Sequence, residues 1–411
     1  SMVGLIPSAI GMDGPIAYDN AGLVFENVKM TANGHSGIET NGNNTNDSVK
    51  LVNSELDVHD GFGIYFPSSG TLTIENSTIT AKTMGVQVCA GSLSINAGSA
   101  ITVTGDAVPK TENDGAIQDG AAISIVNRTG YKGLDKIEVT GGTFESKVAA
   151  IKAYDWDNTN KVEKTFTAND KVAVSGGTFS SAVKEEYCAP GYIPTTNSDG
   201  TFGVKEGVYV AKVDNVKYET LQAAINAAKA GETIYVLGNI DLGTDELSTY
   251  DVKTTVKNVT IDLGGYTVTS AGKYTVYLKV NGWTIQNGTI QNTNASTTYG
   301  TLYVGGSYNS TTLKNLTVES ATNGVYFAIA SNKNGIKASI TVEDGTKISG
   351  NYGVYMKGQP KPYRYTRDGQ EILNVNGGEI TGTTAAIAVF GAAKGNTKAG
   401  VIVNINGGKV Y

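Results

Sequence analysis

Short stretches in which apolar and polar residues alternate recur along the chain, and a turn residue follows each of them. In Leu72-Thr73-Ile74-Glu75 the two kinds of side chain alternate, and Asn76 comes next. Such alternation predicts a half-buried β-strand with its apolar side chains on one face. Asn and Gly tolerate a left-handed backbone at little cost, so we expect the chain to turn at Asn76.

One six-residue pattern occurs ten times: an apolar residue, any residue, Asn or Gly, two further residues and a second apolar residue. Its copies occupy residues 25–30, 51–56, 74–79, 139–144, 174–179, 263–268, 285–290, 313–318, 375–380 and 405–410. Many copies are followed by a short apolar strand that opens with Gly, such as Gly63-Ile64-Tyr65-Phe66. Neighbouring copies are often one period of 22 to 30 residues apart, as from Leu51 to Ile74. This period predicts a solenoid whose strands pair with those of the adjacent coils, and stacked Asn side chains can hydrogen-bond from coil to coil.

The stretch YETLQAAINAAKAGETIYVL interrupts the pattern. Leu221, Ala224, Ile225 and Ala228 recur at helical spacing, and Gly231 supplies a stop. These signals predict a helix near 218–230, followed by a strand. We therefore expect a first domain over 1–187, a hairpin-like linker over 188–207 and a second domain over 208–411.

The repeats, and the helix followed by a strand, resemble right-handed parallel β-helices of the pectin-lyase-like class over nearly the whole chain. The resemblance implies an all-β fold of two right-handed parallel β-helix (solenoid) domains, the second with a short N-terminal capping helix. A leucine-rich repeat is the alternative, but its Leu-rich consensus with a fixed Asn is missing. The linker is similar to hairpins between repeat modules of large cell-surface proteins of Gram-positive gut bacteria. This similarity implies an extracellular or cell-surface location. Because the first repeat begins at Phe25 after a short lead-in with no cap helix, we also expect the N-terminal part of the first domain to be truncated.

Composition and charge narrow the function. The chain has 411 residues, a formal charge of −6 and no block of Lys or Arg, which argues against nucleic-acid binding. No apolar run approaches the ~20 residues of a membrane span. Cys89 and Cys188 are expected to be unpaired, although a disulfide between them stays open. A monomer is expected.

The class that the chain resembles includes polysaccharide lyases and glycoside hydrolases, so catalysis must be considered. Glycoside hydrolysis needs two carboxylates ~5–9.5 Å apart. The best candidates are Asp47, Asp57 and Asp60, with His59 beside them. The chain lacks the Asp-Asp pair, the Gly-His-Gly and the Arg-x-Lys motifs of the hydrolases. Solvated turn residues are therefore the favoured interpretation, and a groove that holds all four side chains would favour an enzyme.

Calcium is the only cofactor that the sequence suggests. Asp155, Asp157, Asn158 and Asn160 place oxygen ligands at the spacing found in Ca²⁺ loops, without the later Gly and acidic ligand of an EF-hand. Glu112, Asp114 and Asp119 form a weaker second candidate. A polar loop without metal is the alternative at both places.

A binding role is the leading hypothesis. Loops between coils commonly carry the variable function of a solenoid. Residues 357–371 concentrate Tyr363, Arg364, Tyr365 and Arg367, and Trp156 lies in another inserted loop. Tyrosine faces can stack on sugars and Arg can bind acidic groups, although these aromatic rings could instead pack on their own coil. The sequence thus predicts a non-catalytic, exported adhesin or stalk that binds a glycan or a host-surface protein.

Overall fold

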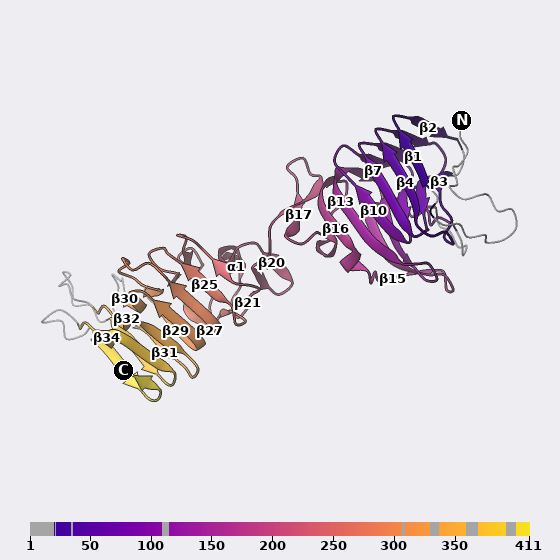
Figure 1. Cartoon of the computed structure of the whole chain (residues 1–411). Helices are drawn as coiled ribbons and strands as arrows, with labels where there is room; N and C mark the ends of the chain where they lie inside the picture. The colour runs from indigo at the N-terminus through magenta and orange to yellow at the C-terminus, as the bar shows by residue number, and fades with distance from the viewer. Residues whose placement is uncertain are drawn as a thin grey trace. The chain divides into compact units, whose positions relative to one another are not determined.

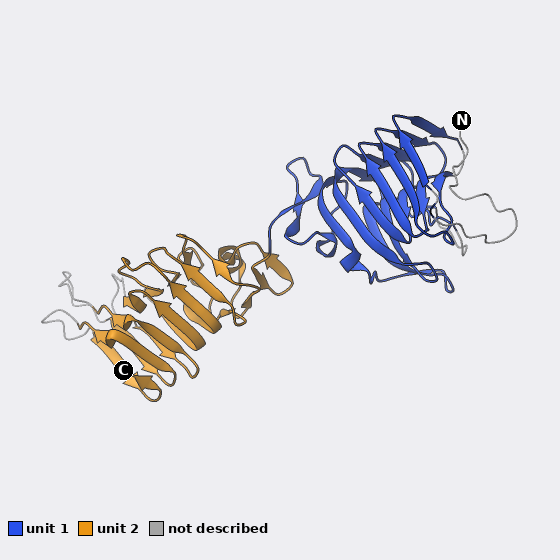
Figure 2. Ribbon diagram, viewed as in Figure 1, with its two compact units in different colours: residues 1–208 blue, residues 209–411 orange. Residues whose placement is uncertain are grey.

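The computed structural model is all-β, as predicted, with 58% of its residues in strands and 4% in helices. It describes residues 20, 22–33, 36–108, 115–305, 309–328, 337–358, 369–391 and 400–411. The chain divides into two compact units, residues 1–208 and 209–411, which Figure 2 colours separately. We describe each unit by itself.

Unit 1 consists of coils whose strands form three columns of parallel partners (Figure 1). The first column contains β1 (Gly22–Glu26), β4 (Asp47–Val52), β7 (Gly70–Glu75), β10 (Gly91–Ile95), β13 (Leu134–Ser146) and β16 (Val172–Phe179). The second contains β2 (Lys29–Ala32), β5 (Glu55–Val58), β8 (Thr78–Ala81), β11 (Ala100–Val103) and the later part of β13. The third contains β3 (Ser36–Glu39), β6 (Phe62–Phe66), β9 (Met84–Val88), β12 (Ala121–Arg128) and β14 (Ala149–Asp157).

The alternation seen in the sequence sets the core. Leu72 and Ile74 are fully buried, whereas Thr73 and Glu75 between and after them are partly exposed. Ile74 aligns with Leu51 on one neighbouring strand and Ile95 on the other, so each coil places apolar side chains directly on those of the next. This stacking buries a continuous apolar column inside the unit.

The Asn residues of the repeat turn the chain as expected. Asn27, Asn53 and Asn76 have φ values of 56°, 48° and 43°, all in the left-handed region. The Nδ2 of Asn76 donates a hydrogen bond to the Oδ1 of Asn53 on the neighbouring coil, at 2.7 Å. The side chains therefore join consecutive coils as well as permitting the turn.

Three further strands complete unit 1. Strand β15 (Val162–Lys164) pairs antiparallel with β14. Strands β17 (Tyr192–Thr196) and β18 (Phe202–Glu206) form an antiparallel hairpin within the stretch predicted to be a linker, and this hairpin belongs to unit 1. Two short 3₁₀ helices, η1 (Asn169–Lys171) and η2 (Glu185–Tyr187), lie beside them in the sequence.

Unit 2 repeats the three-column arrangement. The first column contains β21 (Thr233–Val236), β24 (Thr260–Asp262), β27 (Asn281–Asn292), β29 (Asn309–Ser320), β31 (Lys337–Val342), β33 (Gln370–Val375) and β35 (Gly400–Ile405). The second contains β22 (Ile240–Asp241), β25 (Thr267–Ser270), the later parts of β27 and β29, β32 (Lys347–Met356), β34 (Glu379–Val389) and β36 (Lys409–Val410). The third contains β23 (Leu247–Ser248), β26 (Val276–Leu278), β28 (Leu302–Gly305), β30 (Asn323–Ala328) and the later parts of β32 and β34.

Unit 2 begins with β19 (Ala211–Val213) and β20 (Val216–Tyr218), followed by the helix α1 (Leu221–Ala227). The Thr220 side chain caps the helix by accepting a hydrogen bond from the Ala223 backbone amide. Leu221, Ala224 and Ile225 are buried in the core of unit 2, as their helical spacing predicts. The helix is shorter than the range 218–230.

The parallel, coiled arrangement fits a β-helix or solenoid. The right-handed sense of the coils and the capping role of α1 stay predictions. Cys89 is buried and Cys188 partly exposed, and both are free thiols. Among the described residues, no helix is both long and apolar enough to cross a membrane.

Candidate functional site

Two of the four candidate catalytic residues contact each other, and the other two have partners of their own. The Nε2 of His59 lies 3.1 Å from the Oδ2 of Asp57, and Asp60 pairs with Lys82 at 2.9 Å. Asp47 is fully buried at the start of β4, where its Oδ2 accepts from Asn44. Asp57 and His59 are thus in contact with one another, whereas Asp60 and Asp47 are bonded to other residues.

The candidate calcium ligands lie where β14 turns back into β15. Asp157 accepts hydrogen bonds from the backbone amides of Thr159 and Asn160 and from the Asn160 side chain, and it pairs with Lys164 at 2.6 Å. Lys164 and these donors hold the pKa of Asp157 well below its usual range. The carboxylate therefore fixes the turn and carries its own counter-ion.

The other two members of this candidate set are engaged as well. Asp155 binds Thr167, and Asn158 accepts from the guanidinium of Arg128. In the part of the chain that the structure describes, no group of three or more His, Cys, Asp or Glu side chains is arranged around a metal position.

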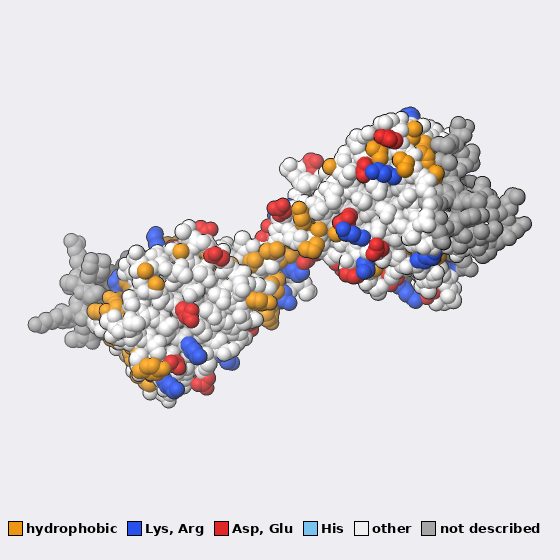
Figure 3. Space-filling view, in the orientation of Figure 1, with side chains coloured by type: hydrophobic (Ala, Val, Ile, Leu, Met, Phe, Trp, Pro, Cys, Tyr) orange, Lys and Arg blue, Asp and Glu red, His pale blue; other side chains and the backbone are white. Residues whose placement is uncertain are grey.

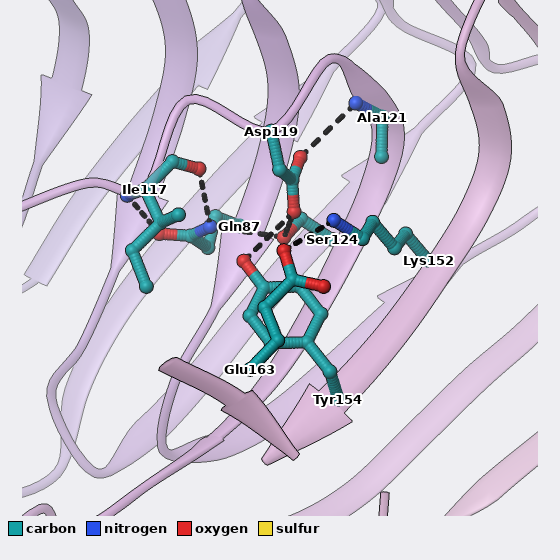
Figure 4. A network of polar contacts seen from close by, with 8 residues as sticks. All are labelled: Gln87, Ile117, Asp119, Ala121, Ser124, Lys152, Tyr154 and Glu163. Carbon is teal, nitrogen blue, oxygen red and sulfur yellow. Dashed lines mark hydrogen bonds and ion pairs between the residues drawn. The ribbon is translucent and has the colours of Figure 1, made fainter. Parts of the chain in front are cut away.

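Asp119, a member of the second acidic stretch, is at the centre of a buried network (Figure 4). It accepts hydrogen bonds from Ser124 Oγ at 2.6 Å, from Tyr154 Oη at 2.9 Å and from the Ala121 amide at 3.0 Å. Burial raises the pKa of this carboxyl. Gln87 holds the adjacent backbone by donating to the Ile117 carbonyl and accepting from its amide, both at 2.8 Å. The network fixes residues 117–121 against the third column of unit 1. Glu112 and Asp114 lie outside the described residues.

Trp156 is not at the surface. It is 6% exposed and packs edge-on against Tyr154 in an apolar cluster on the outer side of the third column. Cys89 belongs to the same cluster, and burial raises the pKa of its thiol to about 12. The ring of Trp156 therefore packs on its own coil, the alternative named for it above. The remaining predicted ligand residues, Tyr363, Arg364, Tyr365 and Arg367, lie outside the described residues.

The most distinctive surface of the molecule is a continuous array of aromatic rings on unit 2. Tyr277, Tyr303, Tyr326 and Tyr355 occupy equivalent positions on β26, β28, β30 and β32, four adjacent strands of the third column. Their strand neighbours, such as Val276 and Leu278, point into the core, so the four rings lie on the outer face. With the rings that contact them they form the tyrosine row: Tyr250, Tyr274, Tyr277, Tyr299, Tyr303, Tyr326, Tyr352, Tyr355 and Phe390.

The rings contact one another in two stacked groups. Tyr277 stacks on Tyr303 with centroids 4.5 Å apart, and Tyr326 stacks on Tyr355 at 5.3 Å with planes 7° apart. Between the groups, Tyr303 meets Tyr326 edge to face at 5.5 Å. Aromatic pairs in these geometries contribute about 0.5–1.5 kcal/mol each beyond their buried area. The row is therefore a stiff surface.

Exposure varies along the row. Tyr250, at one end, is 59% exposed, and Phe390, at the other, is 44% exposed, whereas Tyr326 in the middle is 5% exposed. The Nζ of Lys279 lies 3.7 Å from the centroid of Tyr250. Burial, and then the carboxylate of Glu246 and its hydrogen bond, raises the pKa of Tyr274 to about 12. Burial raises the pKa values of Tyr277 and Tyr326 to about 12 as well.

The sequence also contains a pattern that predicts this row, although above we interpreted it only as evidence for the solenoid fold. Each strand has a Tyr between two core residues, in Val276-Tyr277-Leu278, Leu302-Tyr303-Val304, Val325-Tyr326-Phe327 and Val354-Tyr355-Met356. An aromatic residue that returns at the same outward position of each coil contacts its predecessor. This signal was available from the sequence alone.

No known protein family matches the chain, and no curated protein is significantly similar to it. On the face drawn in Figure 3, Lys and Arg side chains are interspersed with Asp and Glu. The function must therefore be argued from the surfaces themselves.

Proposed function

We propose that the chain is a non-catalytic, exported surface module, built from two right-handed parallel β-helices, that binds glycans through the tyrosine row of unit 2. The three parallel columns and the α1 helix at the start of unit 2 support this architecture. In this proposed architecture, α1 caps the first coil of unit 2, since it packs on β19, β20, β21 and β23. The similarity of the linker to hairpins of surface-protein modules supports a location outside the cell.

The observation that carries the proposal is the clustering of eight of the 22 tyrosines, with one phenylalanine, along the third column of unit 2. On soluble proteins, a contiguous aromatic surface of this kind commonly marks a binding site. Tyrosine offers an apolar ring and a hydroxyl that donates and accepts, which suits the alternating C–H and O–H groups of a sugar. The ring-to-ring contacts hold the surface in place before a ligand arrives, which lowers the entropic cost of binding.

A polysaccharide lyase or glycoside hydrolase is the second candidate. The specific observation in its favour is the contact between Asp57 and His59. Both side chains lie at the surface, with 33% and 55% of their area exposed, and the other candidate carboxylates have their own partners. A single exposed pair supplies neither the second carboxylate nor the enclosed site that glycoside hydrolysis requires.

The deciding experiment compares two exposed tyrosines that differ in belonging to the row. Tyr250→Ala removes the exposed ring at one end of the row. Tyr235→Ala is the matched control, because Tyr235 is 45% exposed and also has a lysine, Lys212, over its ring. The protein and both variants are screened against a glycan array and soluble polysaccharides, and released oligosaccharides are measured in parallel.

We expect Tyr250→Ala to weaken glycan binding about tenfold, since a lost stacking contact of ~1.4 kcal/mol changes an equilibrium constant by that factor. Tyr235→Ala should leave binding unchanged. Equal effects of the two variants would reject the row as the binding surface. Release of oligosaccharides that is lost in Asp57→Asn would replace the binding proposal with the enzyme.

A further inference from the structure

The spacing of the tyrosine row limits the form of a ligand. Tyr277, Tyr303, Tyr326 and Tyr355 stand on consecutive paired strands, so one ring follows another every ~4.8 Å along the row. Each sugar residue of an extended, unbranched polysaccharide advances by a similar length. A ligand lying across the strands would therefore meet equivalent groups at each successive sugar.

The ends of the row differ from its middle. Tyr250 follows β23 and Phe390 follows β34, so five strand spacings, or ~24 Å, separate the two exposed rings. Between them, ring faces are covered by neighbouring rings, as in the Tyr277–Tyr303 stack. The half-buried Tyr277, Tyr303 and Tyr355 can therefore offer a ligand ring edges and hydroxyl groups, whereas the most exposed rings stand at the two ends, with Lys279 over that of Tyr250. This combination suits a chain that stacks at both ends and hydrogen-bonds between them.

The charges beside the row favour an uncharged ligand. Glu246 accepts a hydrogen bond from the backbone amide of Lys273, beside Tyr274, and after burial its charge is the next cause that raises the pKa of the Tyr274 hydroxyl. Strands β28 and β30, which carry Tyr303 and Tyr326 in the middle of the row, contain no Lys or Arg. Lys279 contacts the ring of Tyr250 at the end of the row. A uronate or sulfated polymer would therefore find no cationic partner on the two middle strands.

We infer that the tyrosine row binds an uncharged, unbranched polysaccharide as an extended segment of about five sugar residues, which runs across the strands from Tyr250 to Phe390. This inference rests on the proposed function and adds the class, the length and the direction of the ligand.

The test is a length series. The probes are β-1,4-glucan, xylan, mannan, chitin and an α-glucan, with their oligomers from the single sugar upward, and polygalacturonate is the anionic comparison. Affinity should rise steeply with oligomer length and level off at about five residues. Polygalacturonate should neither bind nor compete. Phe390→Ala should weaken long oligomers about tenfold and leave single sugars unaffected.

A conservative variant separates binding from folding. Tyr303→Phe keeps the ring stack and removes one hydroxyl, so long oligomers should bind about fivefold more weakly. Thermal unfolding of unit 2 should not change. Lost stability with unchanged affinity would show a purely structural row.

The outcomes distinguish the two proposals. If neutral polymers bind and the row variants do not affect them, or if no probe binds, the proposed function fails. If binding requires the row but single sugars bind as tightly as long oligomers, or polygalacturonate binds best, the proposed function stands and this inference is overturned.

Discussion

The close stacking of the coils makes a sharp prediction at Gly324, the second residue of β30. A Cβ atom added there would lie 2.7 Å from the carbonyl oxygen of Gly353 on the next coil and 2.6 Å from Cγ2 of Ile348. The side chain of Ile348 can shift slightly, but the backbone carbonyl belongs to a paired strand. Gly324→Ala must therefore separate two coils, and overpacking of this kind costs ~1–3 kcal/mol. We expect a loss near the upper limit, about 3 kcal/mol.

The loss of stability can be measured through the fluorescence of one tryptophan. The chain has two tryptophans, Trp156 in unit 1 and the fully buried Trp283 in unit 2. In a Trp156→Phe background, the emission of Trp283 reports the unfolding of unit 2 alone. For a domain of this size a loss of 3 kcal/mol lowers the Tm by ~6–12 °C.

Gly238→Ala is the matched control. No atom lies within 4 Å of the position that its Cβ would take, and its backbone is not left-handed. This variant should be neutral or more stable by ~0.4–1 kcal/mol, because Ala restricts the unfolded chain. If Gly324→Ala unfolds at the same temperature as the parent protein, the coils can move apart freely and the packing argument is wrong.

Two further predictions concern ionisable groups. Burial raises the pKa of row hydroxyls such as that of Tyr326 to about 12, above the ordinary 10, so their contribution to stability should be complete below pH 10 and lost as the pH rises towards 12. Ultraviolet absorbance should show tyrosinate forming in this pH window together with unfolding. Ionisation of these hydroxyls at pH 10 in the folded protein would contradict the burial of the row. In unit 1, Asp119→Ala should cost about 3 kcal/mol, because it leaves the Ser124 and Tyr154 hydroxyls buried without their acceptor. Asp119→Asn keeps an acceptor and should cost about 1 kcal/mol; equal losses in urea titrations followed by Trp156 emission would show that the hydrogen bonds are not the cause.

The repeated strands could be predicted because their signal is local and periodic. Leu72, Ile74 and Asn76 each reveal their place through the residues beside them, and the structure puts them in the core and at the turn as expected. The helix was predictable for the same reason, although its ends were not, since Ala228 already has an extended backbone. The role of the glycines at the strand openings needed the structure, because the clash involves an atom of the following coil.

The candidate site was harder to predict because it depends on which side chains meet. The three candidate carboxylates, Asp47, Asp57 and Asp60, are close in sequence. In the structure, however, Asp60 pairs with Lys82 and Asp47 accepts a hydrogen bond from Asn44. Trp156 stood out as a rare residue in a polar loop, and the structure shows that it fills an apolar cluster instead. At Trp156, an unusual local stretch therefore pointed to a residue that packs within unit 1.

The tyrosine row shows that, in a solenoid, positions that recur in every coil are a better guide to a binding surface than unusual local stretches. In a coil of fixed shape, a residue that returns once per period builds a line along the surface, and its chemistry is multiplied by the number of coils. Tyr303 alone would be an ordinary half-buried residue, but Tyr277 and Tyr326 on either side make it part of a surface with a repeat of its own. Such a surface matches a ligand that also repeats, and the unit of an extended polysaccharide has about the length of a strand spacing. The same periodicity that sets the fold thus supplies the strongest argument for the proposed ligand.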